Sequence, residues 1–432
     1  MSSQESKAGV SAQLALSGGA YAGSAASMRI PEGREGPVGP LVYSGRARTS
    51  DRDSGAVPDM TRQPLTVAVV GATGVVGRTM IQVLAEREFP VGELRLMASG
   101  RSAGRTVSID GRSHEIVEAT GDAFDGVDIA LFSAGGDISR ELAPQAAARG
   151  ATVIDNSSSW RMEPTVPLVV SQVNPEDLEG HSGIIANPNC STMQLVPILM
   201  AIRDSVGIER VVVDTYQAVS GTGADAIAEF EGQIRAHVSG QPKQATVYPH
   251  PIAFNALPQV DVFLDNGYTK EEWKVVSESR KILHLPDLRV SCTAVRVPVF
   301  VSHSEAVHVE TREPLSPERA RDLFAAVEGV VIQDDPASST YPLASDAAGK
   351  DDIFVGRVRQ DPSIEGGRGL AFWVVSDNLR KGAATNAVQI AEELVRRGWV
   401  RAAATRGAQP YGVPHGALGR EPVGAATAEG SA

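Results

Sequence analysis

Short, mostly hydrophobic runs mark the chain from residue 64 onward. Such a run is typical of a strand that is buried in a parallel sheet, and 65–70 is the clearest example. Further predicted strands are 94–98, 129–133 and 152–155. Segments with helical spacing follow two of them, at 79–88 and 139–149. The order strand, helix, strand predicts a doubly wound, Rossmann-type α/β domain over residues 64–189.

The pattern changes after residue 190, where the predicted strands become longer. These strands are 210–217, 290–301 and 306–310, and the predicted helices are 224–236 and 317–327. Long strands with few helices between them are typical of an α+β domain. We therefore expect a second domain over residues 190–376, inserted into the first and built on a largely antiparallel sheet.

The segment 377–400 contains the last predicted helix, which has one apolar face. Within 386–397, apolar residues recur at the spacing of one helix face, namely Ala387, Ile390, Ala391 and Leu394. A helix with one apolar face needs a surface to bury it. We expect this helix to return to the Rossmann-type domain.

The two ends of the chain lack any such periodicity. Residues 1–63 and 401–432 are rich in Ser, Gly, Ala and Arg, which is typical of segments without a packed core. We expect a disordered N-terminal arm and a flexible tail. Met60 stands just ahead of the first predicted strand, so natural starts at Met1 and at Met60 both fit the sequence.

Composition and charge exclude several classes of function and of binding partner. With 432 residues, 42% of them apolar, the chain can fill two cores. A net charge of −12 disfavours nucleic acid or an anionic membrane as the main partner and favours a small soluble substrate. No apolar run approaches the roughly 18 residues that span a bilayer. Two cysteines could form at most one disulfide, which is too few to stabilise a chain of this size. We expect a cytoplasmic protein with two free thiols and no metal.

A glycine-rich stretch between the first strand and the first helix predicts a dinucleotide site. It reads GATGVVG, and the residues expected at the cofactor are Gly71, Thr73, Gly74, Val75, Val76 and Gly77. Glycine lets backbone amides approach a pyrophosphate at the positive end of a helix. A turn that needs glycine only for its backbone conformation is the alternative.

The end of the second strand favours NADP over NAD. An NAD enzyme usually has Asp or Glu there, whereas this chain has Ser99-Gly100-Arg101-Ser102. An arginine flanked by hydroxyls suits the 2′-phosphate of NADP. The alternative is that Arg101 is a solvated loop residue.

The sequence Asn187-Pro188-Asn189-Cys190-Ser191-Thr192 places a cysteine where a helix begins. The positive end of a helix favours the thiolate, which makes the cysteine a candidate nucleophile. An inert buried thiol is the alternative. Asn189 either caps the helix or offers its amide to an anion. The other cysteine, Cys292, lies within a predicted strand, and we interpret it as a packing residue.

A catalytic thiol needs a base, and His303 is the candidate. It follows the predicted strand that carries Arg296. Strand alternation would place positions 296 and 303 on opposite faces. A bend or bulge near Pro298 would have to bring them together.

Taken together, GATGVVG, DNSSSWRM, NPNCST, YQAVSGTG, ESRKIL, VRVPVFVSHS and SDNLRKGAA resemble aspartate-β-semialdehyde dehydrogenase, and the actinobacterial and Gram-positive branch in particular. The resemblance covers residues 65–398. It implies an NADP-dependent homodimer that interconverts L-4-aspartyl phosphate and L-aspartate 4-semialdehyde plus phosphate, reductively in the cell. The pathways implied lead to lysine and diaminopimelate, threonine, methionine and isoleucine.

The resemblance also implies roles for individual residues. Cys190 would carry a thioacyl intermediate, His303 would act as acid and base, and Gln217 would orient the intermediate. The substrate's α-carboxylate and α-ammonium call for a cation and a carboxylate, and Arg296 and Glu271 match these positions. The positions that match phosphate contacts are Arg161, Lys274 and Asn189. The positions that match cofactor contacts are Ser133, Gly135, Pro188, Ser220, Gly221 and Asn378.

Two related enzymes and one non-enzyme are the alternatives. N-acetyl-γ-glutamyl-phosphate reductase has a segment close to NPGCYPT, which differs from NPNCST, and the SCTTN segment of glyceraldehyde-3-phosphate dehydrogenase is absent. An inactive relative that acts as a binding protein would usually lack the cysteine or the histidine, and Cys190 and His303 are both present.

Overall fold

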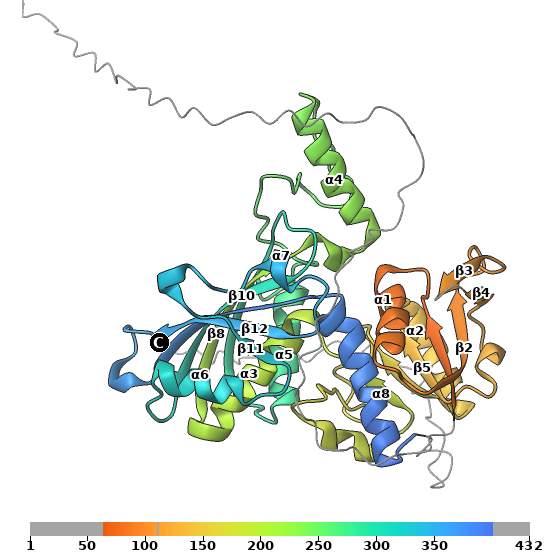
Figure 1. Ribbon diagram of the computed structural model, residues 1–432, viewed down its shortest axis with the longest axis horizontal. Helices are drawn as coiled ribbons and strands as arrows, with labels where there is room; N and C mark the ends of the chain where they lie inside the picture. Colours follow the sequence, from red (N-terminus) through yellow and green to blue (C-terminus); the bar gives the residue numbers. More distant parts are fainter. Residues whose placement is uncertain (1–63, 110–111, 401–432) are drawn as a thin grey trace, which may run out of the picture. The chain divides into compact units, whose positions relative to one another are not determined.

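A computed structural model describes residues 64–109 and 112–400, and all of these belong to one compact unit of the chain (Figure 1). The expected N-terminal arm and C-terminal tail lie outside the described residues. The strands of the first sheet are β1 Leu65–Val70, β2 Val91–Ala98, β3 Thr106–Ile109, β4 Arg112–Glu118, β5 Ile129–Phe132, β6 Thr152–Asp155 and β7 Ile184–Ala186. Their order is β3-β4-β2-β1-β5-β6-β7, and only the pair β3–β4 is antiparallel.

Helices cover this sheet, as the apolar runs predict. They are α1 Val75–Glu86, α2 Gly136–Ala148 and α8 Asn386–Arg397. Every residue of β5, β6 and β7 is buried, which fits a parallel sheet covered on both faces. The apolar face of α8 packs into the same core as Val67 and Val69 of β1, and Figure 1 shows α8 beside the first sheet.

The second sheet has six strands. They are β8 Ile208–Gln217, β9 Arg289–Arg296, β10 His303–Thr311, β11 Val330–Ile332, β12 Ile353–Gln360 and β13 Gly369–Ser376. Their order is β11-β12-β13-β10-β8-β9, with antiparallel pairs in the centre and parallel pairs at both edges. The fold is therefore a Rossmann-like domain followed by a mixed α/β domain, in agreement with the predicted class.

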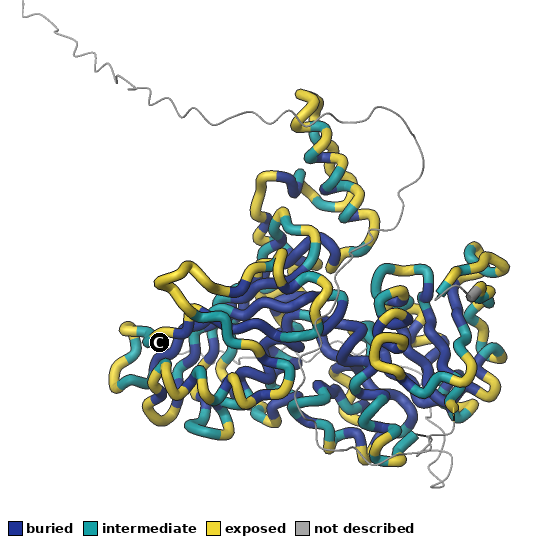
Figure 2. The backbone as a smooth tube through the Cα atoms, viewed as in Figure 1, coloured by how far each residue is buried: buried dark blue, intermediate teal, exposed yellow. Residues whose placement is uncertain are grey.

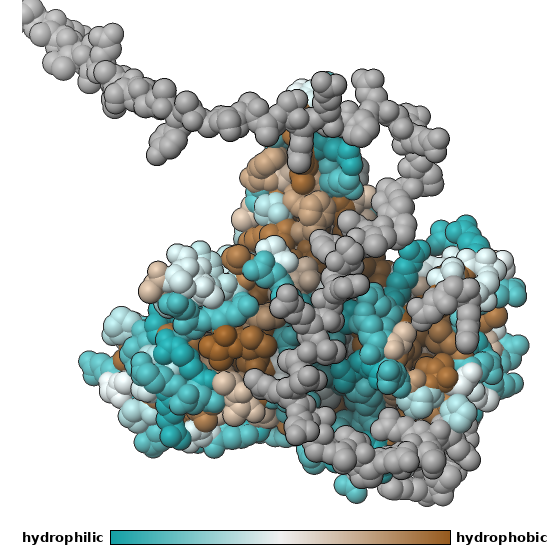
Figure 3. Space-filling model, in the orientation of Figure 1, coloured by the Kyte–Doolittle hydropathy of each residue, from teal (hydrophilic) through white to brown (hydrophobic). Residues whose placement is uncertain are grey.

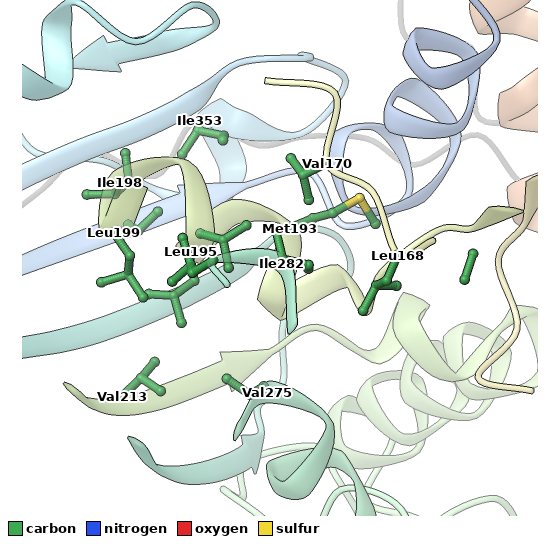
Figure 4. Packing of buried hydrophobic residues seen from close by; sticks show 14 of the residues in the cluster. Leu168, Val170, Met193, Leu195, Ile198, Leu199, Val213, Val275, Ile282 and Ile353 are labelled. Carbon is green, nitrogen blue, oxygen red and sulfur yellow. The ribbon is translucent and has the colours of Figure 1, made fainter. Parts of the chain in front are cut away.

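The remaining helices of the described residues are α3 Cys190–Val206, α4 Ala224–Val238, α5 Lys270–Ile282, α6 Pro317–Ala325 and α7 Ala344–Ala347, with a π-helix at Arg380–Thr385. Helix α3 runs through the largest core, where Met193 and Leu195 pack among residues of β8, α5 and the segment before β7 (Figure 4). Because ten successive positions of α3 from Ser191 are almost all buried, its first turn is held firmly. None of the helices that the structure describes is long and apolar enough to cross a membrane.

Helix α4 stands apart from the main cores. Phe230 and Ala226 of α4 form a small cluster of their own with Ile252 and Ala253. In Figure 2 most of the tube of α4 has the colours of exposed and half-buried residues, and Figure 3 shows brown, apolar surface on the same part of the molecule. Val238, at the end of α4, is 81% exposed.

The structure corrects the predicted strand 290–301, which ends at Arg296. Pro298 has no N–H for a ladder, and Ser302 has a positive φ of 79°, so residues 297–302 form a loop instead. This loop crosses the end of β8, where Val219 N donates to Val299 O at 2.9 Å and Ser220 N to Phe300 O at 3.1 Å. Strand β10 then begins at His303 rather than at 306.

Other boundaries also differ from the predicted ones. Helix α1 begins at Val75 rather than at 79, because Gly77 lies inside the helix and not in the loop. A Cβ on Gly77 would lie 2.2 Å from Gly71 O, so the third glycine serves close packing of helix on loop. Strands β3, β4, β7, β11, β12 and β13 were absent from the predicted elements.

Candidate active site

A pocket of about 510 Å³ opens where the carboxyl ends of β5, β6 and β8 meet the start of α3. Elements of both sheets contribute to it. The lining residues are Val76, Ser133, Asn156, Ser158, Arg161, Pro188, Asn189, Cys190, Gln217, Ser220, Gly221, Thr222, Val260, Asp261, Glu271, Lys274, Arg296, Asn378, Leu379, Gly382 and Ala383. All of the predicted substrate and phosphate residues are therefore brought together, with Cys190 among them.

Cys190 is the first residue of α3, as predicted. Asn189 caps the helix, since its Oδ1 accepts from Ser191 N at 3.0 Å. The thiol itself is half-buried. Burial, and then the nearby Glu271 carboxylate, raise its pKa to about 12 and outweigh Arg296, Arg161 and Lys274. With this pKa the thiol is favoured over the thiolate at neutral pH, which differs from the expectation that the helix start alone would favour the thiolate.

Arg296 and His303 meet at the end of β8, although they come from different strands. Arg296 pairs with Gln217 across β8–β9, and Ser304 pairs with Tyr216 across β8–β10. The loop between the two strands, and not a bulge within one, brings them to one place. Glycine at 221 makes the approach possible, because a Cβ there would lie 3.1 Å from Arg296 Nη1 and 3.3 Å from His303 Nε2.

His303 is fully buried and outside the lining of the pocket. Ala218 N donates to its Nδ1 at 3.0 Å, so the neutral ring carries its proton on Nε2, which has no partner. Burial, followed by the charge of Arg296, lowers its pKa to about 3. The ring is neutral at physiological pH and presents an N–H donor.

Arg296 is a buried cation without a carboxylate partner among the described residues. Its Nη1 donates to Ala218 O at 2.7 Å, while its Nε has no partner. A buried guanidinium in this state is costly unless an anion completes it. Arg296 is therefore suited to bind an anionic ligand.

Glu271 of α5 is the centre of a second charged group. It accepts from Lys274 Nζ at 3.0 Å, Asn189 Nδ2 at 2.9 Å and Gln217 Nε2 at 3.1 Å. Burial alone would raise the pKa of this carboxyl, but Lys274, Asn189 and Gln217 hold it at about 2. The helix places Glu271 and Lys274 on one face, as their spacing predicts.

Arg161 is held by fixed partners. Its Nη1 donates to Glu278 at 2.9 Å, its Nη2 to Asn156 O at 2.7 Å and its Nε to Asn187 O at 3.0 Å. Glu278 also accepts from Asn189 N at 2.7 Å. Each terminal nitrogen of a guanidinium has two hydrogens, so Arg161 keeps one on Nη1 and one on Nη2 for a ligand.

The predicted cofactor residues divide into two sets. Those that line the pocket are Val76, Ser133, Pro188, Ser220, Gly221 and Asn378. Asn378 Nδ2 donates to Ser220 Oγ at 3.0 Å, and its Oδ1 accepts from Ser302 N at 2.8 Å, so it joins two loops of the site. The residues outside this lining are Gly71, Thr73, Gly74, Val75, Gly77, Ser99, Arg101, Ser102 and Gly135.

The glycine loop is shaped for a ligand that passes close to its backbone. Gly71 has a φ of +87°, and a Cβ on it would lie 2.3 Å from Ser133 O. Gly74 caps α1 without any side-chain hydrogen bond, which leaves the first amides of the helix to another acceptor. Ser99, Arg101 and Ser102 form the turn after β2, where Ser102 N donates to Ser99 O at 2.8 Å and Arg101 is exposed.

Sequence reasoning missed several lining residues: Asn156, Ser158, Thr222, Val260, Asp261, Leu379, Gly382 and Ala383. A signal existed for Asn156 and Ser158, since both follow the carboxyl end of a predicted parallel strand, where ligands bind in such sheets. Gly382, in the π-helix, packs directly on the nucleophile candidate, because a Cβ on it would lie 2.9 Å from Cys190 Cβ.

Comparisons with known proteins relate both domains of the chain to one group of enzymes. Residues 66–181 match the family model described as semialdehyde dehydrogenase, NAD binding domain, and residues 199–381 match the semialdehyde dehydrogenase, dimerisation domain. Aspartate-semialdehyde dehydrogenase of Aquifex aeolicus is 54% identical over 339 residues, which cover 77% of this chain and 99% of that protein. The enzyme of Streptomyces akiyoshiensis is 49% identical over 342 residues, covering 76% and 98%.

A solved structure supports the same grouping. The crystal structure of aspartate semialdehyde dehydrogenase II from Vibrio cholerae, complexed with ASA, is 49% identical and superimposes with a TM-score of 0.75. The superposition covers 78% of this chain and 99% of the Vibrio cholerae chain.

Proposed function

The chain belongs to the aspartate-semialdehyde dehydrogenase family, and on this premise we propose that its pocket interconverts L-4-aspartyl phosphate and L-aspartate 4-semialdehyde plus phosphate. The observation that carries the proposal is the position of Cys190, which lines one pocket with Glu271 and with Arg296, a cation that has no carboxylate partner among the described residues. A nucleophile that shares its pocket with a cation and a carboxylate suits an amino acid that reacts at its side chain. In the cell the reaction runs toward the semialdehyde, within the pathways to lysine, threonine, methionine and isoleucine.

Recognition of the substrate rests on its two charges. Arg296 would bind the α-carboxylate, which completes the buried guanidinium. Glu271 would bind the α-ammonium in the place that Lys274 now takes. Gln217, whose Nε2 already donates to Glu271 and to Ser191 Oγ at 2.9 Å, would orient the acyl group against Cys190.

Phosphate would bind beside them. Arg161, which lines the pocket, has one further N–H on each of Nη1 and Nη2, Asn189 has a side-chain amide, and Lys274 would leave Glu271 once an ammonium replaces it. Cations and amide donors are what a phosphate dianion requires.

The chemistry needs a thiolate and a proton donor. As the sulfur of Cys190 attacks the acyl carbon of aspartyl phosphate, the thiol proton passes to the leaving phosphate together with the electrons of the broken C–O bond, which gives a thioester on Cys190 and hydrogen phosphate. The nicotinamide, when bound, supplies the hydride. His303 would donate a hydrogen bond from Nε2 to the oxygen of the hemithioacetal. When the C–S bond breaks, that oxygen becomes the aldehyde carbonyl, and the sulfur leaves as a thiolate that then takes up a proton.

The residues fit a bound dinucleotide. Gly71, Gly74 and Gly77 let the loop pack closely on its own backbone and on Ser133, so that the uncapped first amides of α1 would face a pyrophosphate. Thr73, Val75 and Val76 complete this loop, and Ser99, Arg101 and Ser102 would bind the 2′-phosphate of NADP. Ser133, Gly135, Pro188, Ser220, Gly221 and Asn378 would surround the nicotinamide.

We also propose a cytoplasmic homodimer. The match of residues 199–381 to a dimerisation-domain model supports the dimer. Both cysteines are free thiols, which suits a reducing compartment.

The test is an assay of NADP reduction with L-aspartate semialdehyde, with and without phosphate, beside the Cys190→Ala variant. We expect a phosphate-dependent rate in the wild type, a loss of at least about 1,000-fold in the variant, and weaker activity with NAD. Equal rates for the two proteins would exclude the thioester route. A preference for NAD would exclude the proposed role of Arg101.

A further inference from the structure

Three asparagine side chains form a hydrogen-bonded line that ends at the pocket. Asn386 begins α8, Asn187 precedes Pro188, and Asn156 follows β6. Asn386 Nδ2 donates to Asn187 Oδ1 at 2.6 Å, and Asn187 Nδ2 donates to Asn156 Oδ1 at 2.5 Å. Asn386 and Asn187 are completely buried.

Backbone groups fix the direction of this line. Ser171 N donates to Asn386 Oδ1 at 3.2 Å, Asn386 Nδ2 donates to Val169 O at 2.9 Å, and Asn187 Nδ2 donates to Ala383 O at 2.9 Å. A backbone N–H cannot accept a hydrogen bond and a backbone carbonyl cannot donate one. The oxygen and nitrogen of the Asn386 and Asn187 side-chain amides therefore cannot be exchanged. Asn156 must therefore accept through Oδ1 and present its NH₂ group at the other side.

That NH₂ group has no partner within residues 64–109 and 112–400. Asn156 Nδ2 is buried and makes no hydrogen bond to any of these residues, although Asn156 lines the pocket. Buried donors are rarely left unsatisfied, and a ligand is one of the groups that completes them. The donor therefore points to an acceptor oxygen on something that enters the pocket.

The neighbour of Asn156 indicates which oxygen this is. Arg161 Nη2 donates to the backbone O of Asn156 at 2.7 Å, so Asn156 is in direct contact with the guanidinium proposed to bind phosphate, and both residues line the same pocket. An NH₂ group beside a guanidinium makes one continuous surface of donors for an oxyanion.

We propose that Asn156 is a further substrate-binding residue, whose Nδ2 donates to an oxygen of the phosphate group held by Arg161. Asn187 and Asn386 are positioning residues that set the orientation of its amide. This inference rests on the proposed function and adds a contact to its phosphate site.

The variant Asn156→Asp tests the contact, because it keeps the oxygen that accepts from Asn187 and replaces only the donor. We expect the KM for phosphate to rise about 10-fold or more, since a donor becomes a repelling charge, with kcat at saturating phosphate and the KM for NADP nearly unchanged. Asn156→Ala should raise the KM for phosphate less. The matched control is Asn266→Asp, at an exposed asparagine whose Oδ1 accepts from Tyr268 N, and it should leave all constants unchanged.

Calorimetric titration of inorganic phosphate into the wild type and into Asn156→Asp gives a second readout that needs no turnover. Weaker phosphate binding by the variant, at an unchanged melting temperature, supports the proposal even if the enzyme proves to act on another aldehyde. An unchanged phosphate affinity would overturn it. A raised KM for NADP with an unchanged KM for phosphate would also overturn it and would assign the donor to the nicotinamide carboxamide.

Discussion

Lys274 Nζ lies 3.0 Å from the Glu271 carboxylate and 2.9 Å from that of Asp261. The cation proposed for phosphate is thus paired with the carboxylate proposed for the substrate's ammonium. When the substrate's ammonium pairs with Glu271, Lys274 would lose that partner and could bind phosphate, while its ion pair with Asp261 would keep it beside the site. The two ligands should therefore favour each other's binding.

This coupling can be measured with the Cys190→Ala variant, which binds without reacting. We expect phosphate to lower the dissociation constant of L-aspartate semialdehyde by about 5-fold, a typical size for coupled sites. Calorimetric titration with and without phosphate gives the two constants. In the double variant that also carries Lys274→Ala the effect should vanish, and equal constants in the single variant would contradict the coupling.

The thiol of Cys190 should respond to Glu271 in the ligand-free enzyme. Burial and then Glu271 raise its pKa to about 12, so removing the carboxylate charge should lower the pKa. Alkylation by iodoacetamide at about pH 8 follows the thiolate fraction, and Glu271→Gln should speed it about 10-fold or more while catalysis falls. Slower alkylation of Cys190 in the variant, followed by peptide mass spectrometry, would show that the carboxylate does not act in this way.

The sequence predicted the site in part, and the reasons are physical. The glycine loop and the helix start at Cys190 are local features, so short motifs were enough to find them. The meeting of Arg296 with His303 depends on a loop that leaves one sheet strand and returns on the far side of β8, which strand alternation cannot show. The raised pKa of Cys190 depends on burial and on Glu271, which is distant in sequence.

Gly382 should be needed for the position of Cys190. A Cβ at this site would lie 2.9 Å from Cys190 Cβ and 3.3 Å from its Cα, so Gly382→Ala must shift the first turn of α3. We expect kcat to fall about 100-fold, because small displacements of a nucleophile are costly. Gly232→Ala is the control, since nothing lies within 4 Å of a Cβ there, and steady-state kinetics of both variants should separate them. Normal turnover by Gly382→Ala would contradict the tight contact.

Glu305 should make stability depend on pH. Both of its carboxyl oxygens are buried and make no well-formed hydrogen bond to the residues that the structure describes. Burial, only partly offset by the nearby side chain of Gln194 in α3, raises its pKa to about 8. The folded protein then keeps a proton that the unfolded chain loses, so the free energy of unfolding should fall between about pH 4.5 and 8.

The neutral variant Glu305→Gln removes this dependence. Its advantage over the wild type should grow across that range and reach about 2–4 kcal/mol near pH 8. Urea unfolding at several pH values gives the comparison, with the exposed Glu179→Gln as control. A constant difference between wild type and Glu305→Gln at all pH values would show that Glu305 does not hold the proton.

Cys190 is proposed to carry the acyl group between the two half-reactions. Mass spectrometry of the enzyme quenched with L-aspartate semialdehyde and NADP, without phosphate, detects this intermediate. We expect an aspartyl adduct on the peptide that contains Cys190, its loss when phosphate is added before quenching, and none in Cys190→Ala. Full turnover with no adduct, or an adduct on Cys292, would contradict the account.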